Sequence, residues 1–297
     1  ARGRIVSPGE EHLATRRGAG LFDFSFMGLY EFDDKSELQQ LQTRKLDTLV
    51  PGQIAYTLIL KESGAVAIDA TVWRLDERRF WLFCGKRARY GGRDRSREYA
   101  ILALQGPASG RILARVIGAE AVRTLPYFRF AQSALVVGRI GYSGELGYEI
   151  LVRDADAAAF GRKLLEAGRS EDLRNCGWAA ANSLRIEAGY VLFDREVDGQ
   201  ANPRELGLER LAPGKKFAMT RRLVGLELLG GPGRPEHPVA QLTSECFSPT
   251  LQKYLGLGFV APEIPVGAAV RAGERAARVA ALPFYDPERR RPRATPL

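Results

Sequence analysis

The chain has 297 residues, enough for one large domain or for two or three smaller ones. Hydrophobic residues make up 45% and charged residues 27%, as in an ordinary globular protein, and no apolar run approaches the roughly 20 residues of a membrane span. The N-terminal stretch lacks the apolar core of a signal peptide, and the three cysteines are too far apart to suggest a disulfide framework. We therefore expect a cytoplasmic protein without membrane contact.

The formal net charge is +9, and 36 of the 44 basic residues are arginine. Either a GC-rich genome explains this bias or the protein has an anionic partner, such as a nucleic acid or a polycarboxylate ligand. The positive charge is densest at 289–293 (RRRPR), which can equally be a solvated tail. No aromatic and basic platform typical of nucleic-acid binding is recognisable, so we expect no nucleic-acid partner.

Histidine occurs only twice, at His12 and His237. This scarcity argues against histidine-based catalytic triads and histidine-rich metal sites, and we expect no metal. The chemistry must then rest on carboxylates, tyrosines and arginines.

The first half of the chain alternates between strand and helix patterns. Residues 53–60, 65–75 and 80–85 predict a three-stranded meander. Residues 102–118 read as a strand, a Gly-Pro turn and a helix, and 154–168 as an amphipathic helix with an acidic first turn.

Residues 140–150 (IGYSGELGYEI) place three glycines, two tyrosines and two glutamates between two apolar runs. The spacing fits neither a phosphate-binding loop nor a dinucleotide fingerprint. The stretch is therefore either a plain hairpin or a hairpin that contributes to a binding site.

A second helix is predicted over 175–190, with Asn175 as N-cap and Gly189 as C-cap. From about residue 222 short β segments dominate, and the glycines and prolines at 230–238 suggest a linker nearby. The pattern predicts an α+β body followed by a small β-rich module.

Two carboxylates stand in unusual places. Asp69 interrupts a strand pattern, where aspartate is disfavoured, and shares a face with Thr71 and Trp73. It lies either at an exposed edge or bulge, or in a pocket. Glu187 occupies the last turn of a predicted helix, where the helix dipole disfavours a negative charge, on the same face as Ser183. It is either a solvated charge or an acceptor for ligand N–H groups.

Seven segments in order carry a resemblance to a known family: GLFDFSFMG (20–28), PGQIAYTLIL (51–60), GAVAIDATV (64–72), LQGPAS (104–109), GYSGELGYEI (141–150), NSLRIEAGYVLF (182–193) and CFSPTLQKYLGLGFV (246–260). Together they resemble the aminomethyltransferase (T-protein) family of the glycine cleavage system, which also includes folate-dependent demethylases and related folate-binding proteins. The resemblance covers nearly the whole chain.

The resemblance implies an α+β fold of three subdomains around a central channel that holds tetrahydrofolate. Residues 1–222 would form the folate-binding body from two intertwined subdomains, and 223–297 a C-terminal β-barrel. The 140–150 hairpin would then line the channel.

The resemblance also assigns roles to six residues. Asp69 matches the key carboxylate near the reacting folate nitrogens, where an aspartate can orient an amine and manage its proton. Glu187 matches the acceptor of the pterin N–H groups, whose paired donors suit one carboxylate. The other cofactor-binding residues would be Tyr56, Trp81, Tyr142 and Glu149.

Several departures fall on the donor side. The family motif D-x-S-H-M-G has Phe26 in place of its histidine, and Ile68 replaces the first member of an acidic pair. The segment 86–99 is shorter than the family norm. A folate-dependent transferase is therefore expected whose donor, small or carrier-bound, need not be the lipoyl protein of glycine cleavage, although a lipoyl carrier protein stays a candidate partner. The alternative is a non-catalytic folate-binding relative, whose K-G-C-Y-x-G-Q-E motif this chain lacks.

Overall fold

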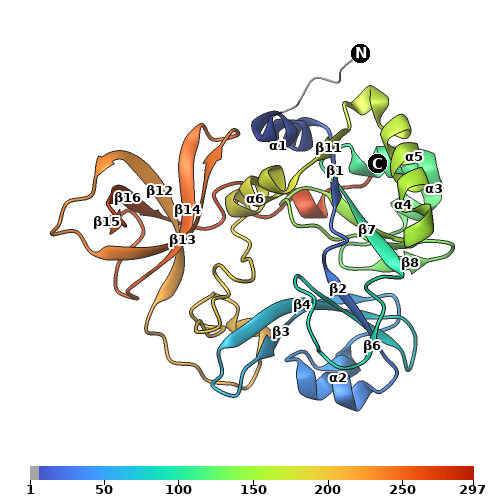
Figure 1. Cartoon of the computed structure of the whole chain (residues 1–297), viewed down its shortest axis with the longest axis horizontal. Helices are drawn as coiled ribbons and strands as arrows, with labels where there is room; N and C mark the ends of the chain where they lie inside the picture. The colour runs from blue at the N-terminus through green and yellow to red at the C-terminus, as the bar shows by residue number, and fades with distance from the viewer. Residues whose placement is uncertain (1–6) are drawn as a thin grey trace.

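The computed structural model describes residues 7–297; residues 1–6, which belong to the predicted body, lie outside this range. Three β structures make up the chain: a six-stranded sheet, a five-stranded sheet and a closed barrel. In Figure 1 the barrel lies on the left, the five-stranded sheet at the bottom and the six-stranded sheet on the right. The predicted α+β fold with a C-terminal barrel is confirmed.

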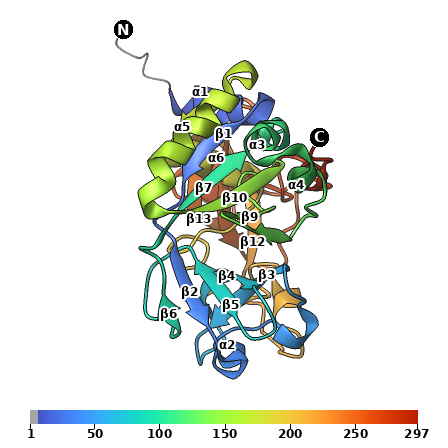
Figure 2. The ribbon, with the colours of Figure 1, turned by 90° about the vertical axis from the view of Figure 1, so that its right-hand side faces the viewer.

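The six-stranded sheet has the order β11-β1-β7-β10-β9-β8. Its strands are β1 (Gly20–Asp23), β7 (Tyr99–Gln105), β8 (Phe130–Gln132), β9 (Val136–Gly138), β10 (Gly147–Arg153) and β11 (Arg174–Cys176). One face packs through buried aliphatic residues against the helices α3 (Ser109–Ile117), α4 (Ala119–Arg123) and α5 (Ala157–Ala167). Figure 2 shows these helices above the sheet and away from the second sheet.

The five-stranded sheet has the order β3-β4-β5-β2-β6. Its strands are β2 (Gly28–Phe32), β3 (Ile54–Leu60), β4 (Val66–Arg74), β5 (Phe80–Cys84) and β6 (Arg93–Asp94), with α2 (Lys35–Leu41) and the 3-10 turn η1 (Leu46–Thr48) beside them. The chain passes from the first sheet to the second after β1 and returns at β7, so the two subdomains are intertwined through this double crossing.

The two faces of β4 meet different cores because side chains alternate along a strand. Ile68 and Val72 pack into a core that includes Leu38 of α2. Trp73, on the face of Asp69, packs into a second core, which holds residues of both sheets and of the helix α6 (Trp178–Glu187). This second core, called the central core below, joins the two sheets.

The barrel closes in the order β12-β14-β13-β15-β16. It consists of β12 (Arg222–Pro232), β13 (Val239–Ser248), β14 (Lys253–Val260), β15 (Ala269–Ala272) and β16 (Arg275–Ala280) around an aliphatic interior. The chain then returns to the body, where Arg139 donates to the Ala294 carbonyl at 2.5 Å. The remaining 3-10 turns are η2 (Asp154–Asp156), η3 (Arg169–Glu171), η4 (Glu209–Leu211) and η5 (Arg291–Arg293).

Two helices connect the barrel with the body. Helix α1 (Pro8–Arg17) begins with a capping box, in which Ser7 and Glu10 satisfy each other's backbone N–H groups. Helix α6 is buried on both sides: Ala181 and Leu184 pack into the central core, and Ile186 packs on the β14 residues of the barrel. No helix within residues 7–297 is long and apolar enough to cross a membrane.

Most elements predicted from the sequence are found, including the meander, the strand-turn-helix and the 140–150 hairpin, which joins β9 to β10. The N-cap prediction was wrong: Asn175 pairs with Leu21 in β11, and Gly177 is the N-cap of α6. Gly189, at φ 67°, follows the C-cap Ala188 by one position. The linker prediction was also wrong, because 230–238 ends β12 and turns into β13 within the barrel.

Gly138 in β9 allows the closest approach of the two sheets. A Cβ atom there would lie 2.1 Å from Cη2 of Trp73, which is fully buried and has no room to move. We expect Gly138→Ala to lower the free energy of unfolding by about 1–3 kcal/mol, measured by urea denaturation. In the matched control Gly9→Ala, the new Cβ meets only Pro249 at 3.7 Å, so the same substitution should be neutral or stabilising by up to about 1 kcal/mol. Equal losses in both variants would contradict this packing.

Candidate functional site

Asp69 and Tyr56 form a hydrogen-bonded pair on neighbouring strands. The register places Asp69 opposite Leu58, two residues from Tyr56, on the same face of β3 and β4. The Tyr56 hydroxyl donates to Oδ2 of Asp69 at 2.9 Å. Burial raises the pKa of Asp69 above its ordinary value, and the hydrogen bond from Tyr56 opposes that rise. The strand position is internal rather than at a sheet edge, so the aspartate is not a solvated edge residue.

Two further tyrosines lie beside this pair. The rings of Tyr142 and Tyr190 stack with centroids 5.9 Å apart, and the Tyr142 hydroxyl donates to the Val191 carbonyl at 2.5 Å. Burial raises the pKa of Tyr142, and the charge of Asp69 raises it further. Tyr56, Asp69, Tyr142 and Tyr190 therefore lie close enough to interact electrostatically, and we call them the tyrosine–aspartate group.

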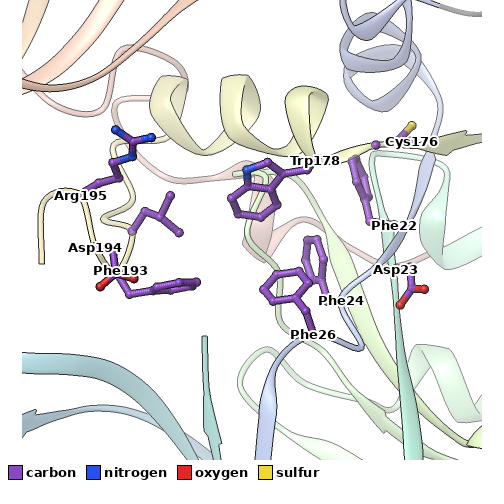
Figure 3. A pocket seen from close by; sticks show the side chains of 11 residues that line it. Phe22, Asp23, Phe24, Phe26, Cys176, Trp178, Phe193, Asp194 and Arg195 are labelled. Carbon is purple, nitrogen blue, oxygen red and sulfur yellow. The ribbon is translucent and has the colours of Figure 1, made fainter. Parts of the chain in front are cut away.

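A cavity of about 390 Å³ lies next to the chain segment that follows Tyr190. The segment 192–195, which follows directly after Tyr190 and Val191, lines the cavity on one side (Figure 3). The Phe193 ring lies against Gly85, because a Cβ atom on that glycine would be 2.5 Å from the ring. Gly85 follows Cys84, the pairing partner of Ala70, so the Phe193 ring lies beside the part of the sheet that carries Asp69.

Glu149 is a buried carboxylate without a partner. It lies in β10, is 8% exposed, and has no hydrogen bond or ion pair among residues 7–297. Burial alone raises its pKa from 4.5 to about 7. Leu151, two residues along the same face, belongs to the central core, and Tyr142 packs against that core. Glu149 thus borders the same interior as the tyrosine–aspartate group, although Asp69 is not among the charges acting on it.

Glu187, by contrast, is fully buried and fully paired. Oε2 accepts hydrogen bonds from Nε and Nη2 of Arg16 at 3.0 and 2.8 Å, while Oε1 accepts from the Ser248 hydroxyl and lies 3.1 Å from Nε2 of His12. Burial would raise the pKa of Glu187, but the hydrogen bond from His12 and the charge of Arg16 outweigh burial and hold it below the ordinary value. Both oxygens therefore already have partners from this chain.

Trp81 lies in the central core with 2% of its surface exposed. It pairs with Trp73, four residues along β4 from Asp69, and its indole N–H donates to Glu31 at 2.8 Å. The structure thus brings Tyr56, Asp69 and Tyr142 together, and places Trp81, Glu149 and Glu187 at separate positions. The roles assigned to all six residues stay predictions.

The sequence reasoning missed a buried ion pair that holds the segment after α6. Arg185 donates to Oε2 of Glu196 at 2.7 Å and to the Tyr190 carbonyl at 3.1 Å. Oε2 of Glu196 also accepts from the Leu192 N–H at 3.0 Å. Oε1 of Glu196 accepts from the hydroxyl of Ser244 in the barrel at 2.6 Å. This network fixes Tyr190 and the cavity wall. The carboxylate that follows the IEAG motif was its only signal in the sequence.

Comparison with known proteins matches both parts of the chain. Residues 6–216 match the GCVT N-terminal domain, and residues 221–286 match the glycine cleavage T-protein C-terminal barrel domain. The chain belongs to the glycine cleavage T-protein family. Among residues 7–297, no three histidine, cysteine or acidic side chains gather to hold a metal ion.

The relatives match over nearly their whole lengths. An aminomethyltransferase of Symbiobacterium thermophilum is 36% identical, with 95% of this chain and 90% of the relative covered, and one of Rubrobacter xylanophilus is 33% identical, with 95% and 87% covered. The crystal structure of the glycine cleavage system aminomethyltransferase T from Bartonella henselae superposes with a TM-score of 0.82 at 26% identity, covering 95% of this chain and 91% of that one.

The alignment with the Symbiobacterium protein extends over 338 positions, more than the 297 residues of this chain. The relative therefore carries residues within the matched region that this chain lacks.

The opposite environments of Glu149 and Glu187 predict opposite effects of amide substitution. The folded-state pKa of Glu149 is raised, so the protein loses stability as the pH rises from about 4.5 through about 7 and the group ionises. Glu149→Gln removes this loss, and above pH 7 it should be more stable than the wild type by about 3 kcal/mol, with little difference near pH 4.5.

Glu187→Gln serves as the counterpart. Because the pKa of Glu187 is lowered in the folded protein, its ionised carboxylate stabilises the fold at neutral pH. That contribution is lost only as the pH falls through the folded-state pKa of Glu187. We expect Glu187→Gln to destabilise the protein by about 3–5 kcal/mol at pH 8. Urea denaturation at pH 5 and pH 8 tests both variants. A Glu149→Gln protein that is less stable than the wild type at pH 8 would show that Glu149 has a stabilising partner.

Proposed function

We propose that the protein is a tetrahydrofolate-dependent transferase of an aminomethyl or methyl group. Both relatives compared above are named aminomethyltransferases. The observation that carries the proposal is the Tyr56–Asp69 pair: a half-buried carboxylate of raised pKa, held by a phenol and bordered by two stacked tyrosines. Such a carboxylate can orient an amine and exchange a proton with it.

The described residues fit a reduced folate. A pterin ring presents an amino group and an adjacent ring N–H, two donors that one carboxylate can accept. Glu149 offers an unpartnered buried carboxylate, whereas both oxygens of Glu187 are occupied by Arg16, His12 and Ser248. We therefore assign the pterin donors to Glu149 and give Glu187 a structural role in place of the predicted one.

Each residue of the tyrosine–aspartate group has a separate task in this proposal. Tetrahydrofolate supplies the ring amine that takes up the one-carbon unit. Asp69 orients that amine and exchanges a proton with it, and the hydrogen bond from Tyr56 limits the rise in the pKa of Asp69. The stacked rings of Tyr142 and Tyr190 offer a flat surface to the cofactor.

The arginines of the returning C-terminal segment lie near these tyrosines. The Arg289 guanidinium is 5.7 Å from the ring of Tyr190, and that of Arg293 is 5.7 Å from the ring of Tyr127. Both side chains are exposed, and neither is in an ion pair within residues 7–297. We assign them to the anionic glutamyl tail of folate, which gives part of the net positive charge a function.

The donor remains the open part of the reaction class. An aminomethyl group on a lipoyl carrier protein and a methyl group on a small molecule are both compatible with a carboxylate that handles the acceptor amine. Phe26 stands where the family motif has a histidine, so this chain differs from the family on the donor side.

Replacing Asp69 separates binding from transfer. Asp69→Asn keeps the size of the side chain and one acceptor oxygen but removes the base. We expect tetrahydrofolate affinity to change by less than about tenfold while one-carbon transfer falls by about 10²–10⁴-fold. Single-turnover assays with saturating folate measure the transfer step. Full transfer by Asp69→Asn would remove the assigned role, and folate binding by the wild type with no transfer from any donor would indicate a non-catalytic folate-binding protein.

The Tyr56→Phe variant tests how the base is tuned. Because the hydrogen bond from Tyr56 lowers the pKa of Asp69, its loss should raise that pKa further. Transfer needs the ionised carboxylate, so the acid limb of the rate profile should move to higher pH, with the rate on the alkaline plateau less affected. An acid limb that stays at the wild-type position would show that Asp69 is not the group titrating.

Folate affinity distinguishes the two glutamates. Glu149→Gln keeps one acceptor oxygen but loses the charge and the other oxygen. A charge-assisted hydrogen bond contributes about 1.5–3 kcal/mol, so we expect tetrahydrofolate to bind at least tenfold more weakly. Wild-type affinity should rise between pH 6 and pH 8 as Glu149 ionises, and this rise should vanish in the variant. Titration calorimetry measures both, and an unchanged affinity and pH dependence in Glu149→Gln would exclude Glu149 as the acceptor.

A further inference from the structure

Gln105, the last residue of β7, places a buried amide group inside the turn 140–147. Its side chain is 1% exposed. A Cβ atom on Gly141 would lie 2.0 Å from the amide oxygen, and one on Gly147 would lie 2.4 Å from the amide nitrogen. Neither glycine has a positive φ angle. Glycine is therefore needed at these two positions to make room for the amide, and not to allow a special backbone conformation.

Both ends of this amide are hydrogen-bonded to the turn. Nε2 of Gln105 donates to the Ile140 carbonyl at 3.4 Å, and Oε1 accepts from the Ser143 hydroxyl at 2.8 Å. A carbonyl oxygen can only accept, so Ile140 fixes which end of the amide carries the nitrogen. Ile140 and Ser143 lie on either side of Tyr142 in the sequence. One side chain thus holds the backbone before and after Tyr142.

Tyr142 is fixed at both of its ends. At the far end of the side chain, its hydroxyl donates to the Val191 carbonyl at 2.5 Å and its ring stacks on Tyr190. At the backbone end, the neighbouring Ser143 donates to Gln105 through its hydroxyl and accepts from Nη1 of Arg16 at 2.8 Å through its carbonyl. The stacked pair is therefore held as a preformed surface by contacts within the chain.

We infer that Gln105 is a positioning residue for folate and that it acts through Tyr142. The inference rests on the proposed function, in which the rings of Tyr142 and Tyr190 offer the cofactor a flat surface. Gln105 itself is enclosed by the turn and too deeply buried to contact a ligand in that place. A surface that is already ordered spares the ligand the free-energy cost of ordering it. Loss of the amide should therefore weaken folate binding although no ligand contact is removed.

A buried amide can also serve stability alone, and Gln42 provides the matched comparison. Gln42 follows α2 and is 5% exposed. Its Oε1 accepts from the Thr57 hydroxyl at 2.6 Å, and its Nε2 donates to the Arg44 carbonyl at 2.9 Å. Thr57 lies on the face of β3 opposite to that of Tyr56, because side chains alternate along the strand. Gln42 thus has the burial and bonding of Gln105 but holds a different turn.

Titration calorimetry of the full chain with tetrahydrofolate compares Gln105→Leu with Gln42→Leu. We expect binding at least about fivefold weaker in Gln105→Leu and within about twofold of the wild type in Gln42→Leu. Both variants should unfold at lower urea concentration, because both leave buried polar groups without a partner. Equal weakening of folate binding in the two variants would show a general loss of stability and overturn the inference, as would wild-type affinity in Gln105→Leu.

Ser143→Ala is a milder variant for the case in which Gln105→Leu does not fold. It removes the donor to Gln105 and the weaker acceptor of the Glu145 N–H at 3.2 Å, and it leaves the amide in its place. We expect binding of tetrahydrofolate about two- to fivefold weaker than in the wild type. Unchanged affinity in Ser143→Ala would contradict positioning by the Gln105 amide.

A double-mutant cycle tests the route through Tyr142. Tyr142→Leu removes the ring that Gln105 is inferred to position. In that background Gln105→Leu should weaken tetrahydrofolate binding by less than about twofold, because the two residues act on the same contact. Losses that multiply independently would show that Gln105 does not act through Tyr142 and would overturn the inference.

The wild-type titration separates this inference from the proposed function. A wild-type protein that does not bind tetrahydrofolate would refute the proposed transferase and this inference with it. Binding and transfer by the wild type, with unchanged affinity in Gln105→Leu, would refute the positioning role alone.

Discussion

Arg16 is the buried cation around which the barrel and the body are joined. Its guanidinium donates to Oε2 of Glu187 in α6 and, through Nη1, to the Ser143 carbonyl and to Glu145 in the turn before β10. The second oxygen of Glu187 accepts from Ser248 of the barrel. Four parts of the chain, spread from residue 16 to residue 248, thus meet at one charge that burial would otherwise penalise heavily. Removal of either partner would leave the other buried and uncompensated.

This arrangement changes what the buried carboxylates can do. Glu187 is held ionised by Arg16 and His12, and its oxygens have no capacity left for a ligand. Asp69 accepts a hydrogen bond from one phenol, and burial raises its pKa. Glu149 has neither charge nor donor nearby, so its pKa approaches 7. The same functional group thus stands in three environments: fully paired with other side chains, hydrogen-bonded to one phenol, and unpaired in the interior.

Local patterns predicted the elements well, because strands β3–β5 and helices α3 and α5 follow clear periods of two and 3.6 residues. The fold itself was predicted from the order of the seven segments that resemble the family. The odd position of Asp69 was visible in its strand, and alternation alone placed it on the face of Trp73.

What the sequence could not supply were contacts between distant segments. The partner of Glu187 lies 171 residues away in α1, so its charge looked available for a ligand. Asn175 looked like a helix cap because pairing of β11 with β1 is likewise nonlocal. The glycines and prolines at 230–238 shape a turn within the barrel as well as they would shape a linker.

The segment 190–196 makes the two halves of the candidate site interdependent. Tyr190 stacks on Tyr142 in the tyrosine–aspartate group, and Phe193 forms part of the cavity wall. Glu196 ties this segment to Arg185 in α6 and to Ser244 in the barrel, and all three side chains are buried. A shift of the barrel strand β13 would therefore move both walls together. Because one buried carboxylate fixes this segment, the spacing between the tyrosine–aspartate group and the cavity is set by the packing of the barrel on α6.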